Sequence, residues 1–153
     1  MRIHRSFRWL AVIVWVGFIW FMSSHSVPPG DPIGKVADII RTIPVQLTLP
    51  GTSVEFMVGK AGHLLAYSLL GVLLLAATWG RLKNRVLGVM LIGVMVAVID
   101  ETRQYFVPGR EAAVRDVVID AVGLAIGIII ALSLRKAYLT RLAQGEAFCS
   151  SRQ

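Results

Sequence analysis

Ionisable and polar side chains interrupt three otherwise apolar stretches of this sequence. Charged groups inside a membrane are costly, so they usually face a compensating group, a cavity or a functional path. Carboxylates and an imidazole offer acid/base groups and ligands for a divalent metal. The candidate ligand-binding set consists of Lys60, His63, Tyr67, Asp100, Glu101, Gln104, Arg110, Asp116 and Asp120.

Helical spacing predicts that these side chains gather on shared faces. In the second apolar stretch, Lys60, His63 and Tyr67 are spaced i, i+3 and i+7, which places them on one helix face. Gly71 continues that face and would admit a close neighbour. The third stretch ends with its own polar group, formed by Asp100, Glu101 and Gln104.

The fourth apolar stretch combines acids and small residues on one stripe. Asp116, Asp120, Gly123 and Gly127 are spaced i, i+4, i+7 and i+11. The two glycines form a GxxxG pair, which permits close contact between helices. The face that packs against a neighbour is therefore predicted to carry the acids.

Composition and length identify the elements that must position these groups. The chain has 153 residues, of which 56% are hydrophobic and 16% are charged, whereas soluble domains are about 45–50% apolar and about 25% charged. A membrane-spanning helix needs about 20 apolar residues. We predict an all-α membrane protein with a single domain over 1–153, a basic tail at 135–153, and four transmembrane helices at about 7–22, 56–79, 86–106 and 117–134.

The first predicted helix also has the basic start and apolar centre of a signal peptide. It contains three tryptophans, and the SSHSVP sequence that follows at 23–28 has no clear small-x-small cleavage site. We therefore expect a retained helix, with cleavage as the alternative.

The basic residues predict the orientation in the membrane. Of the 16 Lys and Arg residues, ten lie on the side that includes both termini and six lie on the other side. The positive-inside rule then places both termini in the cytoplasm. Eight of the nine acids fall on the external side, so the candidate set is predicted to lie near the outer membrane surface. This topology explains the net charge of +7, so nucleic-acid binding is not expected.

Two connecting segments have signals of their own. Residues 31–43 begin with an Asp-Pro N-cap pattern and have apolar residues at helical spacing, which favours either a short amphipathic helix on the outer leaflet or an ordinary ordered loop. Pro108 and Gly109 predict a type II turn that holds Arg110 at the outer surface. The only cysteine is Cys149, so no disulfide can form within the chain.

These motifs resemble those of the VanZ-like family of bacterial membrane proteins. The likeness covers about residues 22–134 and is carried by KAGH at 60–63, DETRQYFVPGR at 100–110, RDVVID at 115–120, and Gly123 with Gly127. It implies a multi-pass protein of the bacterial cytoplasmic membrane. The founding member is associated with resistance to the glycopeptide teicoplanin, so the resemblance points to a role in the cell envelope.

Two positions depart from that family pattern. Many relatives have a histidine where this chain has Arg103, and many have an acid where it has Ala66. A catalytic set that used either group would be altered here, whereas a structural or binding role is less affected.

The first functional hypothesis is binding of an envelope lipid or a cell-wall-related ligand at the outer face of the membrane. Arg110, Lys60 and Arg103 would hold an anionic headgroup, and the histidine and the acids would shape the site. A purely structural role is the alternative, in which Arg110 and Arg115 neutralise the acids of the fourth helix.

The second hypothesis is a membrane-embedded enzyme acting on an envelope lipid or a cell-wall precursor. Its catalytic candidates are His63, Glu101, Asp116 and Asp120, which also offer ligands for a divalent metal cofactor. No HExxH or GxSxG string is present, so the residues leave open whether the protein is an enzyme. The third hypothesis is a proton-coupled transporter or channel, whose pore a homo-oligomer could form.

The first hypothesis predicts that Arg110→Glu abolishes binding of an anionic headgroup, because the reversed charge repels it. Lipid-overlay or native mass-spectrometry binding of the purified protein measures this. Unchanged binding would contradict the role given to Arg110.

Overall fold

The computed structural model describes residues 5–24, 54–78, 85–106 and 113–150, and four long helices make up the regular structure of these residues. The helices are α1 (Arg5–Ser23), α3 (Val54–Ala77), α4 (Arg85–Gln104) and α5 (Val114–Ser150). The predicted all-α fold with four long helices is confirmed. The predicted segment at 31–43 and the predicted turn at 108–109 lie outside the described residues.

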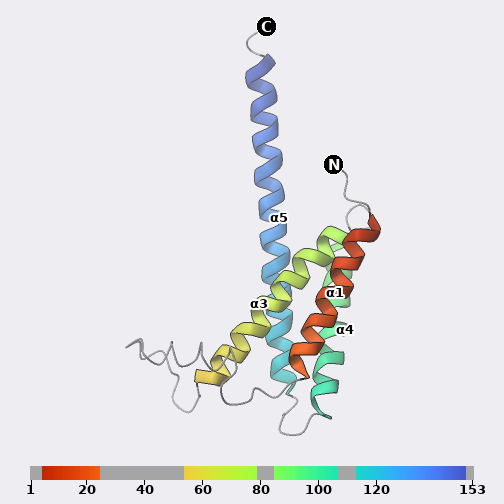
Figure 1. Ribbon diagram of the computed structural model, residues 1–153. Helices are drawn as coiled ribbons and strands as arrows, with labels where there is room; N and C mark the ends of the chain where they lie inside the picture. The colour runs from red at the N-terminus through yellow and green to blue at the C-terminus, as the bar shows by residue number, and fades with distance from the viewer. Residues whose placement is uncertain (1–4, 25–53, 79–84, 107–112, 151–153) are drawn as a thin grey trace.

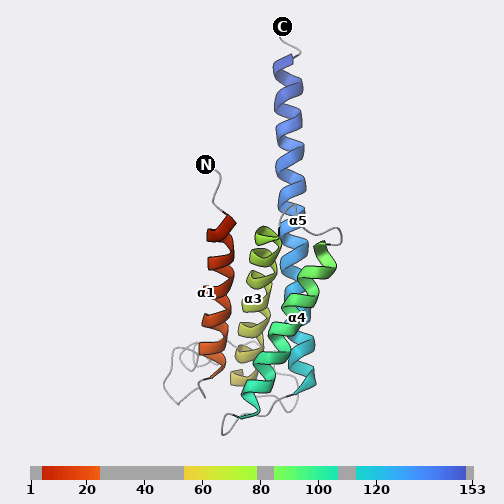
Figure 2. The ribbon, with the colours of Figure 1, turned by 90° about the vertical axis from the view of Figure 1, so that its right-hand side faces the viewer.

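The last helix is longer than its predicted span. That span ends at about residue 134, whereas α5 continues to Ser150. The added stretch is rich in Leu, Arg and Ala, which are good helix formers, and it contains no proline. Nothing local therefore ends the helix at the membrane surface. The extension stands clear of the other helices (Figures 1 and 2), and the side chains of residues 133–144 are exposed.

The helices alternate in direction along the bundle. α1 and α4 run one way, and α3 and α5 run the other way (Figures 1 and 2). The start of α1 and the end of α5 therefore point to one end of the bundle. The end of α4 and the start of α5 lie at the opposite end, together with the start of α3 (Figure 2). That the terminal end faces the cytoplasm stays a prediction from the basic residues.

Three of the described helices contain a segment long and apolar enough to cross a membrane. These segments are Ser6–Ser23, Gly59–Ala77 and Val114–Gln144. α4 also has a spanning length of 20 residues, but charged residues interrupt its last two turns. It buries Asp100 and exposes Leu87, Leu91 and Met95. A polar inner face and an apolar outer face suit a helix surrounded by lipid, and its passage across the membrane stays a prediction.

Glycines bring the backbones of α3 and α5 together at the largest interface of the bundle. A Cβ atom at Gly123 would lie 2.5 Å from the carbonyl oxygen of Leu64, and one at Gly127 would overlap the backbone of Ser68. A Cβ atom at Gly71 would likewise meet the α5 backbone. The predicted close approach at Gly71 and at the GxxxG pair is confirmed, because only glycine leaves room for it.

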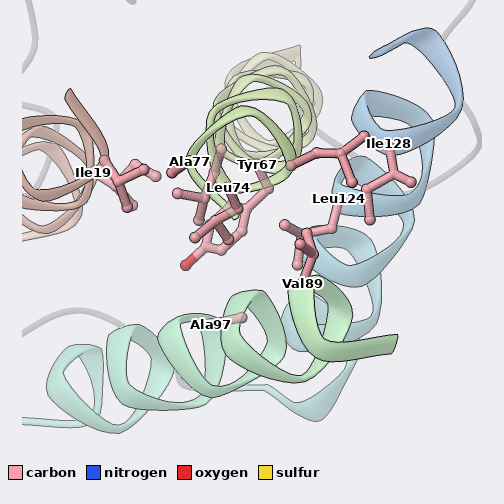
Figure 3. Packing of buried hydrophobic residues seen from close by; sticks show 11 residues of the cluster. Ile19, Tyr67, Leu74, Ala77, Val89, Ala97, Leu124 and Ile128 are labelled. Carbon is pink, nitrogen blue, oxygen red and sulfur yellow. The ribbon is translucent and has the colours of Figure 1, made fainter. Parts of the chain in front are cut away.

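The apolar core is centred on α3, which contacts each of the other three helices. Leu74 and Tyr67 of α3 lie between Ile19 of α1, Leu124 of α5 and Ala97 of α4 (Figure 3). All five side chains are buried. This packing holds the polar residues of α3, α4 and α5 at one end of the bundle.

Gly127→Ala is expected to destabilise the bundle, because the added Cβ atom must displace the Ser68 backbone. Overpacking of this kind costs about 1–3 kcal/mol, which would lower the thermal unfolding midpoint of the purified protein in detergent. Gly17→Ala is the matched control, since nothing lies within 4 Å of a Cβ atom at that position in α1. Equal midpoints for the two variants would contradict the close contact.

Candidate functional site

Eight of the nine predicted ligand-binding residues lie in the described part of the chain, and they come from the same end of the bundle. α4 contributes from its last two turns, α5 from its first two turns, and α3 from its early and middle turns (Figure 2). This polar cluster consists of Lys60, His63, Tyr67, Asp100, Glu101, Gln104, Asp116 and Asp120. Arg110, the ninth residue, lies outside the described residues.

His63 and Asp120 form the innermost polar contact between α3 and α5. The Nδ1 atom of His63 lies 3.2 Å from Oδ1 of Asp120, whose side chain is completely buried. The contact is possible because Gly123, one turn further along α5, packs directly against the α3 backbone. The His63 ring also stacks on Tyr67, with 6.4 Å between ring centroids. The Asp120 carboxylate and the Tyr67 ring therefore together fix the orientation of the His63 imidazole.

Lys60 and Asp116 form an ion pair one turn closer to the start of α5. Their side chains are 23% and 7% exposed, so water only partly reaches the pair. Arg115 is more distant, with its Nε atom 3.8 Å from Asp116 and its side chain 66% exposed. The sequence predicts Arg110 or Arg115 as the neutralising group for the α5 acids, whereas the close cation at Asp116 is Lys60.

Asp100 joins α4 to α1. Its Oδ2 atom accepts a hydrogen bond from the Ser23 hydroxyl at 2.7 Å and one from the Gln104 amide at 3.2 Å. The Asp100 side chain is completely buried. Ser23 is the last residue of α1, so this carboxylate fixes where α1 ends against α4.

Arg103 is directed toward α1. Its guanidinium donates to the Ser24 hydroxyl at 2.7 Å and lies over the Trp20 ring, 5.1 Å from the centroid. It also lies 3.8 Å from Oδ1 of Asp100. The role predicted for Arg103, holding an anionic headgroup, competes with these contacts. Spacing within one helix gave no signal for Trp20 and Ser24, since their role depends on how α1 meets α4.

Glu101 ties the end of α4 to the start of α5. Its Oε2 atom accepts a hydrogen bond from the backbone N–H of Ala113 at 3.2 Å. Ala113 directly precedes the first residue of α5, where backbone N–H groups lack helical acceptors. A carboxylate at this place is favoured by the positive end of the helix dipole.

Several buried oxygens of the polar cluster have no hydrogen-bond partner among the described residues. Those on Asp100 (Oδ1) and Asp116 (Oδ1) each have an arginine nitrogen 3.8 Å away. The others are the Tyr67 hydroxyl, Glu101 Oε1 and Asp120 Oδ2. A buried polar atom left unpaired costs about 1–3 kcal/mol, so the cluster keeps a capacity to bind hydrogen-bond donors.

The described residues contain no group of three or more His, Cys, Asp or Glu side chains placed to hold a metal ion. His63 and Asp120 bring two such groups together. This part of the chain therefore does not provide a set of metal ligands for a metal-dependent enzyme. Acid/base catalysis by the same residues does not require a metal.

Comparison with known families supports the resemblance seen in the motifs. The VanZ/LLP1 family model matches residues 7–135. The chain belongs to the VanZ/LLP1 family. The matched region runs from α1 into α5 and contains every residue of the polar cluster. No curated protein and no solved structure matches the chain significantly.

In this VanZ/LLP1 chain, both departures from the expected family pattern lie against α1. Arg103 contacts Trp20 and Ser24, as described above. At Ala66 the backbone carbonyl accepts a hydrogen bond from the indole N–H of Trp15 at 2.9 Å. Neither position therefore contributes an acid or an imidazole to the polar cluster, and both support the attachment of α1.

Ser23→Ala is expected to weaken the attachment of α1, because buried Asp100 loses one of its two hydrogen-bond donors. The loss should cost about 1–3 kcal/mol and lower the thermal midpoint in detergent. Thr102→Ala is the control, since that exposed hydroxyl bonds only to the Val98 carbonyl of its own helix. A Ser23→Ala midpoint equal to that of Thr102→Ala would show that this hydrogen bond does not hold α1.

Proposed function

We propose that this VanZ/LLP1 membrane protein binds the polar part of an envelope lipid or of a cell-wall-related ligand in the polar cluster. The observation that carries the proposal is the set of buried oxygens that have no hydrogen-bond partner among the described residues, contributed jointly by α3, α4 and α5. In a purely structural network, buried polar atoms are almost all paired. A ligand with donor groups would supply the missing hydrogen bonds.

The confinement of the polar cluster to one end favours binding over transport. In the described part of the chain, Thr78 is the one buried polar residue at the other end, and its hydroxyl donates to the Leu74 carbonyl at 2.7 Å. The buried residues in between are apolar, among them Leu70, Leu75 and Ile128. A polar route across the described bundle therefore stops at the cluster.

The cluster is open to its surroundings through Lys60 and His63, whose side chains are 23% and 19% exposed. With both termini in the cytoplasm, as the basic residues predict, this end faces the outside of the bacterial cytoplasmic membrane. Envelope lipids and cell-wall precursors are present at that surface. An outer-face site of this kind is compatible with the association of the founding VanZ protein with teicoplanin resistance.

A second candidate function is acid/base catalysis on such a ligand. It is favoured by the contact between His63 and Asp120, because a carboxylate that orients an imidazole is a common arrangement for proton transfer. Glu101 and Asp116 would then be auxiliary acids. Release of a chemically altered lipid by the purified protein would identify an enzyme, and loss of that release in His63→Gln would assign the imidazole to it.

His63→Ala is expected to reduce ligand binding at least tenfold. The substitution removes the imidazole that lines the site and leaves the Asp120 carboxylate without its hydrogen-bond donor. The measurement is the amount of lipid that stays bound to the purified full-length protein in native mass spectrometry. Thr140→Ala is the control, since its exposed hydroxyl bonds within the α5 extension. Equal lipid retention in wild type and His63→Ala would contradict a binding site in the polar cluster.

A further inference from the structure

Three oxygens of the polar cluster share one property that suggests the chemistry of the ligand. The Tyr67 hydroxyl, Glu101 Oε1 and Asp120 Oδ2 have no hydrogen-bond partner among the described residues. Their residues are 0%, 5% and 0% exposed. Each comes from a different helix, namely α3, α4 and α5. We call these three atoms the oxygen triad.

Contacts link the residues of the oxygen triad across the three helices. Asp120 contacts His63, whose ring stacks on Tyr67 with 6.4 Å between ring centroids. Glu101 accepts a hydrogen bond from the backbone N–H of Ala113, directly before α5. The Tyr67 oxygen points away from its own helix toward α4 (Figure 3). The three residues of the triad therefore lie where α3, α4 and α5 pack together.

Two cations of the described region have close partners outside the oxygen triad. Lys60 pairs with Asp116, and Arg103 contacts α1 and lies near Asp100. Glu101 forms no ion pair with a lysine or arginine in the described part, and the ionic contact of Asp120 is with His63. Buried carboxylates are stable only when hydrogen-bond donors or cations compensate them. Among the described residues, the triad therefore has more acceptor oxygens and more negative charge than the neighbouring donors and cations compensate.

We propose that the oxygen triad binds a primary ammonium group of the ligand. A primary ammonium carries three N–H donors and a positive charge, which matches three acceptor oxygens that include two carboxylates. The pairing of Lys60 with Asp116 is the same chemistry one helical turn away. The inference rests on the proposed ligand-binding function and names the headgroup chemistry that it requires.

A lipid series that differs only in its N–H donors tests this proposal. Full-length protein is titrated by native mass spectrometry with phosphatidylethanolamine, its N-methyl and N,N-dimethyl derivatives, and phosphatidylcholine. Affinity is expected to fall stepwise along the series, by about tenfold or more overall, because charged hydrogen bonds are lost. Soluble ethanolamine is the second arm: binding of ethanolamine without preference among the lipids would support an ammonium group from a non-lipid source.

Substitutions in the oxygen triad should remove the selectivity. Glu101→Gln and Asp120→Asn each replace a carboxylate with an amide of similar shape, so we expect at least a tenfold weaker binding of phosphatidylethanolamine. Tyr67→Phe removes one neutral acceptor and should cost a few-fold. Glu146→Gln is the charge-matched control, since residue 146 lies about 39 Å further along α5 from Asp120.

Other outcomes would overturn the inference. Equal affinity along the methylation series, or stronger binding of anionic phosphatidylglycerol that still depends on His63, would show a ligand site without ammonium specificity. Glu101→Gln and Asp120→Asn variants that lower the thermal midpoint but keep the selectivity would show that the two carboxylates only support the bundle. Absence of any bound lipid or amine in wild type would contradict the proposed function itself.

Discussion

The backbone contact between α3 and α5 is the constraint on which the rest of this structure depends. Gly123 and Gly127 leave no side chain between the two helices, so Leu64 and Ser68 of α3 meet the α5 backbone directly. The contact brings the acids of α5 within reach of the basic groups of α3. At a normal interhelical distance these acids would be buried without compensation, at a high cost in an apolar environment. The glycines therefore lower the energetic cost of burying these acids, because they allow the acids to pair with the basic groups of α3.

α1 and α4 stabilise the same end by different contacts. Asp100 accepts from Ser23 at the last residue of α1, and Arg103 covers Trp20 on the same helix. Glu101 reaches across to the backbone that begins α5. Each acid of α4 thus holds a neighbouring helix in place. The N-terminal helix is part of the support of the polar cluster as well as a membrane segment.

The polar cluster differs from a closed salt-bridge network in the balance of its charges. Lys60 and His63 each compensate one acid of α5, whereas the contact of Glu101 within the described part of the chain is a backbone N–H. The remaining acceptors come from three different helices, α3, α4 and α5. This surplus of acceptors among the described residues is the reason for proposing a cationic rather than an anionic ligand. The sequence assigns an anionic headgroup to Arg110, Lys60 and Arg103. Arg110 lies outside the described residues, Lys60 pairs with Asp116, and Arg103 contacts α1.

The sequence by itself determined the four long helices and the faces that carry their polar residues, because hydropathy and helical periodicity are local properties of the chain. Its motifs also carried the resemblance to the VanZ-like family, which the family model then showed. The faces with Lys60 and His63 on α3, and with Asp116 and Asp120 on α5, were predictable from spacing alone. The tertiary structure decided which cation meets which acid, that Arg103 is directed to α1, and which oxygens have no donor among the described residues. These properties depend on the register and separation of helices far apart in the chain, which the glycine contact sets and which no local pattern encodes.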